Sequence, residues 1–297
     1  MKKALFILSA ASLLLLQACG GGGGDGTPTS SDNTAPPSST SGDNTGASAT
    51  PPGSDTGTGG TSATAMTDQG SVSAPFQVGA ASHFILVGPA SFNSGSLSSS
   101  NSQQATDGAM TNLGGNQLSG AYAVQDMAGD ASFAIGRWAE GDVTSSTGNT
   151  DTLTGADGRA YHYIAYQSLS AFPTGALHCE GGDFTTPTYT GGGSNAALTG
   201  VTSGAAVDIA FSGNSGALSG AMTVTANGET AAINLPNQLT SPAGMAFTSV
   251  SASGPSTGVQ LADAGNGAYA LIVQFATVTP SGARYIGVGR LSCTSSQ

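Results

Sequence analysis

Short apolar runs, separated by clusters of Gly, Asn, Asp and Ser, fill the chain from Val72 to its end, and they constrain the fold more than any other feature. Between Tyr269 and Ala276, one alternating set of residues is Tyr, Leu, Val and Phe and the other is Ala, Ile, Gln and Ala, which is the period of a half-buried β-strand. No window offers a sustained apolar stripe at the 3.6-residue period of a helix. The sequence therefore predicts an all-β fold.

The predicted strands are bounded on both sides by turn-forming residues. Asp157-Gly158, Asn227-Gly228 and Asn266-Gly267 are dipeptides favoured in two-residue hairpin turns. The predicted strands are His83–Val87, Gln117–Val124, Ser132–Trp138, Ala160–Gln167, Ala176–Cys179, Ala206–Phe211, Ala217–Thr225, Thr230–Leu235, Ala246–Ser251, Ala268–Thr277 and Arg284–Ser292.

A polar, turn-rich segment at residues 141–158 suggests a boundary within the folded part of the chain. We expect a β-rich, handle-like domain in residues 71–148 and an eight-stranded antiparallel β-barrel in residues 149–297. Eight strands can close into a small barrel that is filled by side chains, and closure removes exposed sheet edges. A two-sheet sandwich is the alternative architecture.

The N-terminus has the pattern of an export signal. Two lysines precede the apolar run Ala4–Leu16, which is shorter than the ~20 residues that span a bilayer and is typical of a cleaved signal peptide. Leu16 and Ala18 before Cys19 resemble the lipobox of bacterial lipoproteins, in which the signal is removed and the cysteine is acylated. We therefore expect a signal peptide in residues 1–18 and a palmitate-type lipid anchor at Cys19. An ordinary secretory signal with a stray cysteine is the alternative.

Residues 19–70 are expected to form a disordered tether. Past Cys19 they consist almost wholly of Gly, Ser, Thr, Pro, Asp, Asn and Ala, and Met66 is the one large apolar side chain. Such a segment cannot bury enough apolar surface to offset the entropy lost on ordering.

The two cysteines beyond the lipobox, Cys179 and Cys293, are most simply explained as a disulfide, because paired cysteines of exported proteins are usually oxidised to disulfides. Such a bond would join an early strand of the expected barrel to its last strand. Two buried free thiols are the alternative.

The charged residues exclude several classes of function. Both lysines lie in the signal peptide, and the remaining basic residues are four arginines against 17 acidic residues. Because nucleic-acid binding relies on Lys and Arg, we expect no nucleic-acid partner. Schiff-base and Walker-type chemistry both need a lysine, and the chain has none after the signal peptide. The zinc-protease, serine-hydrolase and P-loop motifs are absent from the sequence, and the histidines are too widely spaced to form a metal motif. We expect no enzyme, no catalytic residue, no metal site and no cofactor.

Three further features each have two interpretations. His162, between two tyrosines, is predicted to be a partly exposed strand residue rather than a ligand-binding one. Trp138 is predicted to fill the core rather than to anchor an interface. The acidic segment 149–158 is expected to be a solvated turn rather than a calcium site, since it lacks the EF-hand spacing.

The order of several motifs resembles that of bacterial surface lipoproteins of the transferrin-binding protein B and factor H-binding protein type. The motifs are Ile135-Gly136-Arg137-Trp138-Ala139-Glu140-Gly141, Tyr161-His162-Tyr163-Ile164, the Pro173/Gly175 turn, the loop from Phe184 to Tyr189, Val207-Asp208-Ile209-Ala210-Phe211 and Leu218-Ser219-Gly220. The resemblance covers residues 76 to 297 and implies a handle domain followed by an eight-stranded barrel.

The resemblance also implies display at the cell surface and binding of a ligand. Gly20 after the acylated cysteine resembles the signal for passage to the outer membrane. We expect an outer-membrane lipoprotein that binds a protein ligand without catalysis. The alternatives are capture of haem or another small molecule, with His83 as the candidate haem ligand, and a structural role in the envelope. The chain has no lysine after the signal peptide, unlike those receptors, so no partner-contacting residue is carried over.

Overall fold

The computed structural model describes residues 70–194, 196–248 and 254–296, which consist of strands, turns and loops within one compact unit. The predicted all-β class is confirmed. The expected signal peptide, Cys19 and the expected tether up to residue 69 lie outside the described residues. Among the described residues, no helix has the length and apolar character needed to cross a membrane.

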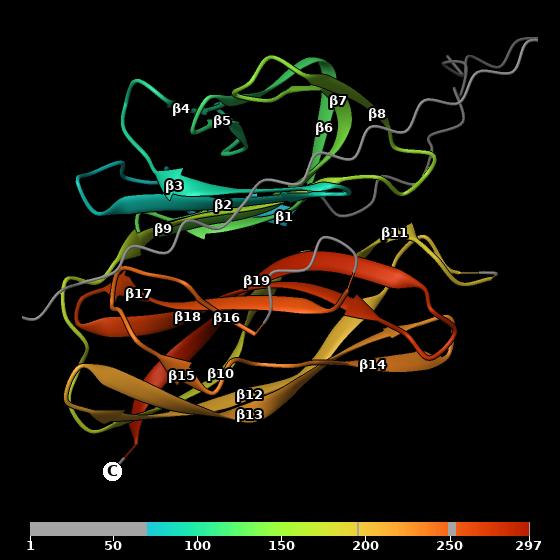
Figure 1. Cartoon of the computed structure of the whole chain (residues 1–297). Coiled ribbons are helices and arrows are strands. Elements are labelled where there is room, and N and C mark those ends of the chain that lie inside the picture. The colour runs from blue at the N-terminus through green and yellow to red at the C-terminus, as the bar shows by residue number, and fades with distance from the viewer. Residues whose placement is uncertain (1–69, 195, 249–253, 297) are drawn as a thin grey trace, which may run out of the picture. The chain divides into compact units, whose positions relative to one another are not determined.

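Strands β1 to β9 form a mostly antiparallel array, here called the N-terminal sheet (Figure 1). Its order is β3–β2–β9–β7–β6–β5–β4, with β8 added to β7 and β1 lying parallel to β6. The strands are β1 (Gly70–Val72), β2 (Ser82–Gly88), β3 (Ser91–Ser96), β4 (Ser102–Gln104), β5 (Met110–Leu113), β6 (Asn116–Asp130), β7 (Phe133–Thr144), β8 (Thr150–Thr154) and β9 (Tyr161–Ser168).

Strands β10 to β19 form the C-terminal sheet, in the order β14–β13–β12–β10–β19–β18–β17–β16. Strand β11 pairs with β19, and β15 pairs with β13. The strands are β10 (Ala176–Phe184), β11 (Thr188–Gly191), β12 (Val201–Ser212), β13 (Ser215–Ala226), β14 (Glu229–Ile233), β15 (Gln238–Leu239), β16 (Ala246–Phe247), β17 (Ser256–Gly265), β18 (Ala268–Val278) and β19 (Arg284–Ser296).

The change from one sheet to the other comes after β9, and not at the expected boundary between residues 148 and 149. Strand β8 pairs with the second half of β7, and β9 pairs with the first half of β7 and with β2. The polar segment at residues 141–158 is therefore the end of one hairpin and the loop after it, inside the N-terminal sheet. A short pairing of β9 with β17 also joins the two sheets.

The expected closed barrel is not completed by backbone pairing among the described residues. The sheet order ends at β14 on one side and β16 on the other, and no pairing of described residues joins β14 or β15 to β16. Strand β14 does approach β18, because the Thr277 hydroxyl donates to the Ala232 carbonyl at 2.8 Å. Pro236 and Pro242 lie in the intervening chain, and each removes a backbone donor that a continuous strand would need.

Two of the three predicted hairpin turns are confirmed. Asn227-Gly228 joins β13 to β14 and Asn266-Gly267 joins β17 to β18, with φ of 51° and 77° in the first turn and 53° and 75° in the second. Both central residues of a type I′ turn need positive φ, which Asn and Gly adopt readily. The prediction for Asp157-Gly158 is wrong, because β8 and β9 both pair with β7 and not with each other.

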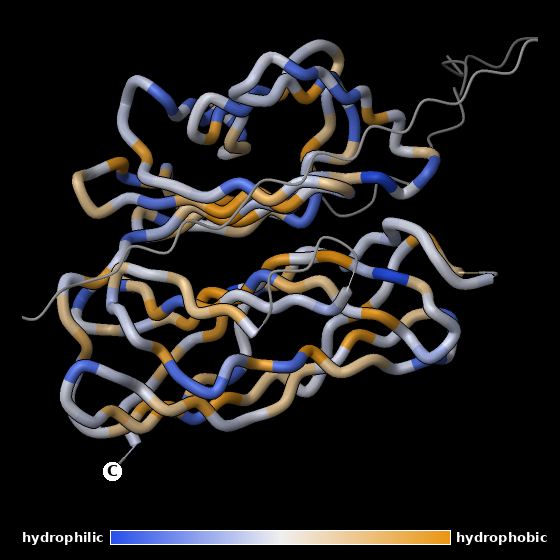
Figure 2. The backbone as a smooth tube through the Cα atoms, viewed as in Figure 1, coloured by the Kyte–Doolittle hydropathy of each residue, from blue (hydrophilic) through white to orange (hydrophobic). Residues whose placement is uncertain are grey.

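Each sheet has an apolar core, and a third apolar cluster joins them. Figure 2 shows hydrophobic segments along the strands that meet between the two sheets. Trp138 lies in the core of the N-terminal sheet with no exposed surface, and its indole Nε1 donates to the Met110 carbonyl at 2.7 Å. The predicted core role of this tryptophan is confirmed.

Candidate binding site at the junction of the sheets

The two sheets meet through an apolar layer, where β2 and β9 lie over β18 and β19 (Figure 1). The strands that form it have buried residues in succession, since both of their faces are covered, and so they do not alternate cleanly between buried and exposed. The layer consists of Ile85, Val87, Phe133, Ile135, Ile164, Tyr166, Ala262, Ala270, Ile272, Ile286 and Val288. We call this region the junction.

A buried ion pair between the neighbouring strands β6 and β7 lies at the junction. Arg137 Nε donates to Asp126 Oδ2 at 2.7 Å, and both side chains are largely buried. The same carboxylate accepts the backbone N–H of Thr186 at 2.8 Å and the Thr186 hydroxyl at 3.1 Å. Because Asp126 belongs to β6 and Thr186 lies between β10 and β11, this carboxylate ties the sheets together.

Two glycines bring the segment around Thr186 into position. The register of β10 against β19 shifts after Glu180, where Gly181 and Gly182 have φ of 62° and 113°. A Cβ atom on Gly182 would collide with the Arg290 carbonyl oxygen, so only glycine fits this bulge. Past the bulge the chain runs along the junction.

His162 on β9 faces this segment and has no exposed surface. Its Nδ1 lies 2.8 Å from the Thr185 hydroxyl and its Nε2 lies 2.7 Å from the Thr188 hydroxyl. Desolvation, and to a smaller extent the charge of Arg137, hold the pKa of His162 well below its usual value, so the ring is neutral. The expected partial exposure of His162 is wrong, because the C-terminal sheet covers this face of β9.

A cavity of about 510 Å³ opens beside the apolar layer. Its wall is largely apolar, with a few hydroxyl groups, one amide and one guanidinium group. The described residues that line it are Val87, Gly88, Pro89, Ala90, Ser91, Phe92, Thr190, Phe247, Gly254, Ser256, Gln274, Ala276, Arg284 and Ile286. We call it the junction cavity.

Strand register explains how the polar and apolar groups come together on one side of the cavity. Ala276 and Ile286 are directly opposed on β18 and β19. Gln274 is two residues from Ala276, and Arg284 is two residues from Ile286, so all four side chains lie on the same face of this strand pair. The opposite wall comes from the end of β2 and the turn into β3.

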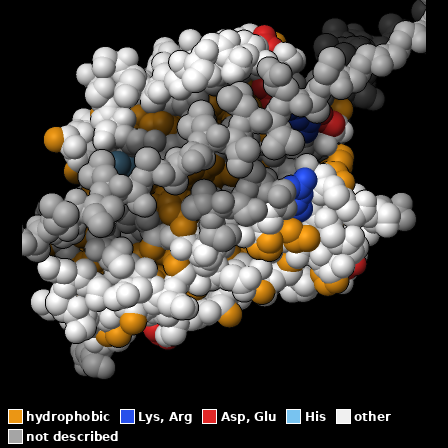
Figure 3. Space-filling view, in the orientation of Figure 1, with side chains coloured by type: hydrophobic (Ala, Val, Ile, Leu, Met, Phe, Trp, Pro, Cys, Tyr) orange, Lys and Arg blue, Asp and Glu red, His pale blue; other side chains and the backbone are white. Residues whose placement is uncertain are grey.

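Two exposed phenylalanines lie at the cavity and come from different sheets. Phe92 on β3 is 42% exposed and Phe247 on β16 is 38% exposed. Their rings meet edge to face, with centroids 5.7 Å apart. In the space-filling view, hydrophobic side chains gather in the hollowed region between the sheets (Figure 3). Exposed aromatic rings beside a cavity are typical of a surface that contacts a ligand or partner.

The haem candidate His83 does not line this cavity. It lies at the start of β2, where its Nδ1 is 3.0 Å from the Ala81 carbonyl and its Nε2 is 3.4 Å from the Ser96 hydroxyl. Its ring stacks on Tyr166 with centroids 6.1 Å apart. The structure thus places His83 apart from the apolar cavity that a large planar ligand would need.

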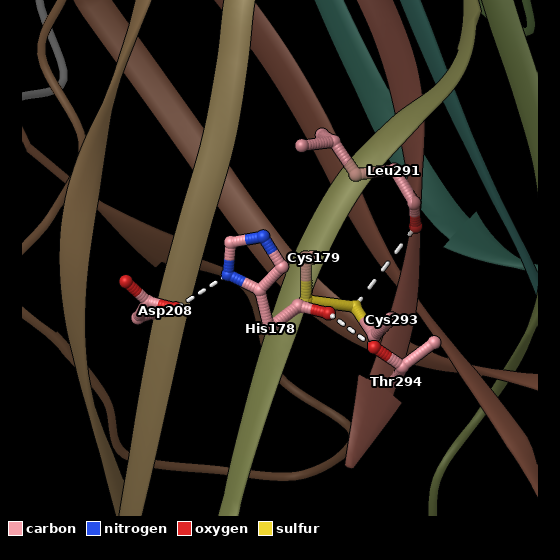
Figure 4. The surroundings of a disulfide bond; sticks show 6 residues. All are labelled: His178, Cys179, Asp208, Leu291, Cys293 and Thr294. Carbon is pink, nitrogen blue, oxygen red and sulfur yellow. Dashed lines mark hydrogen bonds and ion pairs between the residues drawn. A yellow bond between two sulfur atoms is a disulfide. The ribbon is translucent and has the colours of Figure 1, made fainter. Parts of the chain in front are cut away.

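The predicted disulfide is confirmed. Cys179 and Cys293 are directly opposed on β10 and β19 and are bonded, and both are buried (Figure 4). The neighbouring His178 points away from the sulfur atoms, and its Nδ1 lies 2.6 Å from Asp208 Oδ1. Hydrogen bonds to Asp208 and then Glu180 raise the pKa of His178.

In the acidic segment 149–158, the carboxylate of Asp151 is engaged by neighbouring protein side chains. Both carboxylate oxygens of Asp151 accept from Arg159 Nη2 at 2.8 Å, and the hydroxyl of Tyr161 donates to Oδ2 at 3.2 Å. Across residues 70–194, 196–248 and 254–296, no group of three or more His, Cys, Asp or Glu side chains is arranged to hold a metal ion.

The cavity residues were not singled out by the sequence, because they come from seven strands and the segments between them, which no motif connects. Two features could have drawn attention to them. Phe92 stands in a run of Ser, Asn and Gly, where a large aromatic residue is unusual, and Arg284 is one of very few cations in an acidic chain.

Comparison of the chain with protein-family models, with curated proteins and with solved structures finds no match. The resemblance to transferrin-binding protein B-type lipoproteins therefore stays a prediction, and function is argued from the junction cavity.

Proposed function

We propose that this protein is a non-enzymatic binding protein of the bacterial outer membrane, anchored by an acyl group on Cys19, with its ligand held in the junction cavity. The observation that carries the proposal is the cavity itself. Its volume of about 510 Å³ falls within the range of roughly 300–1,000 Å³ that is usual for ligand sites. Apolar walls with a few polar groups are also usual for such sites.

The chemistry of the wall favours binding over catalysis. The described lining residues include no His, Cys, Asp, Glu, Lys or Tyr, which are the usual general acids and bases. They do include hydroxyl, amide and guanidinium groups, which orient a ligand through hydrogen bonds. These groups are suited to binding a ligand that is released without having reacted.

A protein ligand, as the sequence led us to expect, would cover Phe92 and Phe247 and insert a side chain beside them into the cavity. The rings supply apolar area at the mouth, and aromatic residues are frequent at the energetic centre of interfaces. A small molecule would occupy the same cavity without needing the exposed rim.

The proposal is tested by capture from serum on beads that carry the full-length protein. We expect proteins retained by the wild type to be lost when Phe92 and Phe247 are both replaced by Ser. Tyr122→Ser is the matched control, since Tyr122 is also an exposed aromatic residue, at 41%, but does not line the cavity. Retention that is equal in all three proteins would contradict a protein ligand at this site.

The anchor and location are tested separately. Mass spectrometry of the exported protein should find an acylated cysteine at its N-terminus, derived from Cys19. Protease treatment of intact cells should remove the folded part if it faces outward. An unmodified N-terminal thiol would overturn the proposed anchor.

A further inference from the structure

We propose that the junction cavity takes a small, uncharged aromatic molecule that carries one amide group, with its amide at Gln274 and its ring beside Phe247. This inference rests on the proposed function and names the chemical class of a small ligand for the same cavity.

The side-chain amide of Gln274 is a buried polar group that the protein leaves without a partner. Gln274 lines the junction cavity and is only 4% exposed. Across residues 70–194, 196–248 and 254–296, no group donates to its Oε1 or accepts from its Nε2. Because a buried donor or acceptor without a partner is costly, a ligand that supplies both partners gains most at this point of the wall.

An amide is the small group that satisfies both atoms of Gln274 at once. Its N–H can donate to Oε1 while its carbonyl oxygen accepts from Nε2. A carboxylate or a ketone can only accept, so either would leave Oε1 buried without a donor. The hydrogen-bonding pattern of Gln274 therefore favours an amide over these two groups.

The charges around the cavity favour a neutral ligand. Arg284, the one charged residue among the described lining residues, already interacts with other groups of the protein. It also lies apart from Gln274, because Arg284 is opposite Val278 on the β18–β19 pair and Gln274 is opposite Val288. The formal net charge of −11 disfavours an anion, and the described wall has no Asp or Glu to pair with a cation. An uncharged molecule avoids the cost of burying an unpaired charge.

The strand register places an aromatic ring next to this amide. Phe247 on β16 is opposite Gly258 on β17, and Gly258 is opposite Gln274 on β18, so the three residues share one face. A Cβ atom on Gly258 would lie 2.7 Å from the Phe247 ring and 2.9 Å from Gln274 Nε2, so the absence of a side chain lets ring and amide approach the same point. Phe92 meets Phe247 edge to face, and a ligand ring can add to this pair in the same way.

The test compares hydrocinnamamide with benzylacetone, in which a methyl group replaces the amide NH₂ group, and with the charged acid hydrocinnamate. All three share the phenethyl tail. Each is titrated by calorimetry into full-length protein in lipid nanodiscs, with empty nanodiscs as the blank. We expect saturable one-to-one binding of the amide, about tenfold or more tighter than binding of the ketone or the acid, because only the amide satisfies both atoms of Gln274.

Two variants assign the two parts of the ligand. Gln274→Met removes the amide and keeps an unbranched side chain, so hydrocinnamamide should then bind no more tightly than benzylacetone. Gln238→Met is the matched control, because Gln238 is an exposed residue of β15 outside the cavity. Ala276→Phe should fill the cavity and abolish binding of all three compounds. Ala268→Phe is its control, because Ala268 is an exposed residue of the same strand outside the cavity.

Urea unfolding checks that each variant is folded before it is titrated. If Ala276→Phe does not fold, Ala276→Leu takes its place and should weaken the binding of all three compounds.

The outcomes separate this inference from the proposed function. A ketone or acid that binds as tightly as the amide, with binding lost in Ala276→Phe, would overturn the amide and leave the cavity as a binding site. A preference for the amide that persists in Gln274→Met, or binding that survives Ala276→Phe, would place the site elsewhere and overturn the inference. The absence of saturable binding of the amide would also overturn it, while the capture experiment would still decide the proposed function.

Discussion

Replacing His162 by Gln tests whether a buried neutral imidazole makes the junction sensitive to acid. The ring has no exposed surface, and its two nitrogens lie within 2.8 Å of the Thr185 and Thr188 hydroxyls. Protonation would place a second cation beside the buried Arg137, which is its cross-strand partner on β7. The facing carboxylate, Asp126, is already engaged by that arginine and by the backbone of the C-terminal sheet.

The sign of the effect follows from the direction of the pKa shift. A histidine in the unfolded chain has a pKa of about 6.5, and burial holds the folded-state pKa of His162 well below it. Below about pH 6.5 the unfolded chain therefore takes up a proton that the folded chain does not. The stability that His162 contributes is complete above this pH, and it is lost as the pH falls toward the folded-state pKa.

The magnitude is set by one proton. While the pH lies between the two pKa values, each pH unit lowers the free energy of unfolding by up to about 1.4 kcal/mol. Each such pH unit is a sizeable fraction of the usual ~5–15 kcal/mol of a domain.

Urea unfolding at several pH values, followed by tryptophan fluorescence, measures this contribution. At neutral pH His162→Gln should be less stable than the wild type by about 1–3 kcal/mol, because the two threonine hydroxyls lose well-placed partners. This difference should shrink as the pH falls below about 6.5. Two curves that stay parallel down to about pH 4.5 would refute the reasoning.

His178→Gln is a control of opposite sign. Hydrogen bonds to Asp208 and Glu180 raise the pKa of His178 in the folded state. Its contribution is therefore present below the unfolded pKa and is lost as the pH rises through the folded one. Relative to the wild type, this variant should become less stable on acidification, whereas His162→Gln should become more stable.

Three other substitutions test the supports of the fold by urea unfolding. Replacing Cys179 and Cys293 by Ser should cost about 5 kcal/mol, the chain-entropy value for a bond that spans 114 residues, and a cost below about 1 kcal/mol would argue against this entropic account. Trp138→Phe should cost about 1–3 kcal/mol by creating a cavity and leaving a buried carbonyl without its donor, and the wild type should resist quenching of its single tryptophan by iodide. Asp126→Asn should cost about 3–5 kcal/mol by leaving the Arg137 charge buried without its partner; adding Arg137→Met should recover part of the loss, and no recovery would contradict the ion-pair explanation.

The strands that the sequence predicted are those whose own residues carry a clear pattern. The predicted run Ala268–Thr277 matches β18, and Arg284–Ser292 matches most of β19. Strands β3 and β17 were missed, because the first is rich in Ser and the second carries Gly and Asp among its apolar residues. Both form because a neighbouring strand pairs with them along their length, and that support cannot be read from their own composition.

The environment of a single side chain was harder to predict than its strand. His162 was correctly placed on a strand, but its burial depends on Thr185 and Thr188, which approach from a different sheet. The junction cavity has the same origin, since its walls are brought together by long-range packing. The disulfide was predictable from the count of cysteines and the expected export, because it needs no knowledge of the sheet order.

The disulfide between Cys179 and Cys293 also determines how the protein responds to mechanical tension. If the chain is pulled from the proposed anchor at Cys19, the load passes through β1 to β9 before it reaches β10, where it meets the covalent bond to the last strand. The 114-residue separation of the two cysteines corresponds to roughly 400 Å of fully extended chain, and the bond withholds this length from any stretching. Force would thus unfold the N-terminal sheet and open the junction cavity, while the strands between the two bonded cysteines cannot be extended.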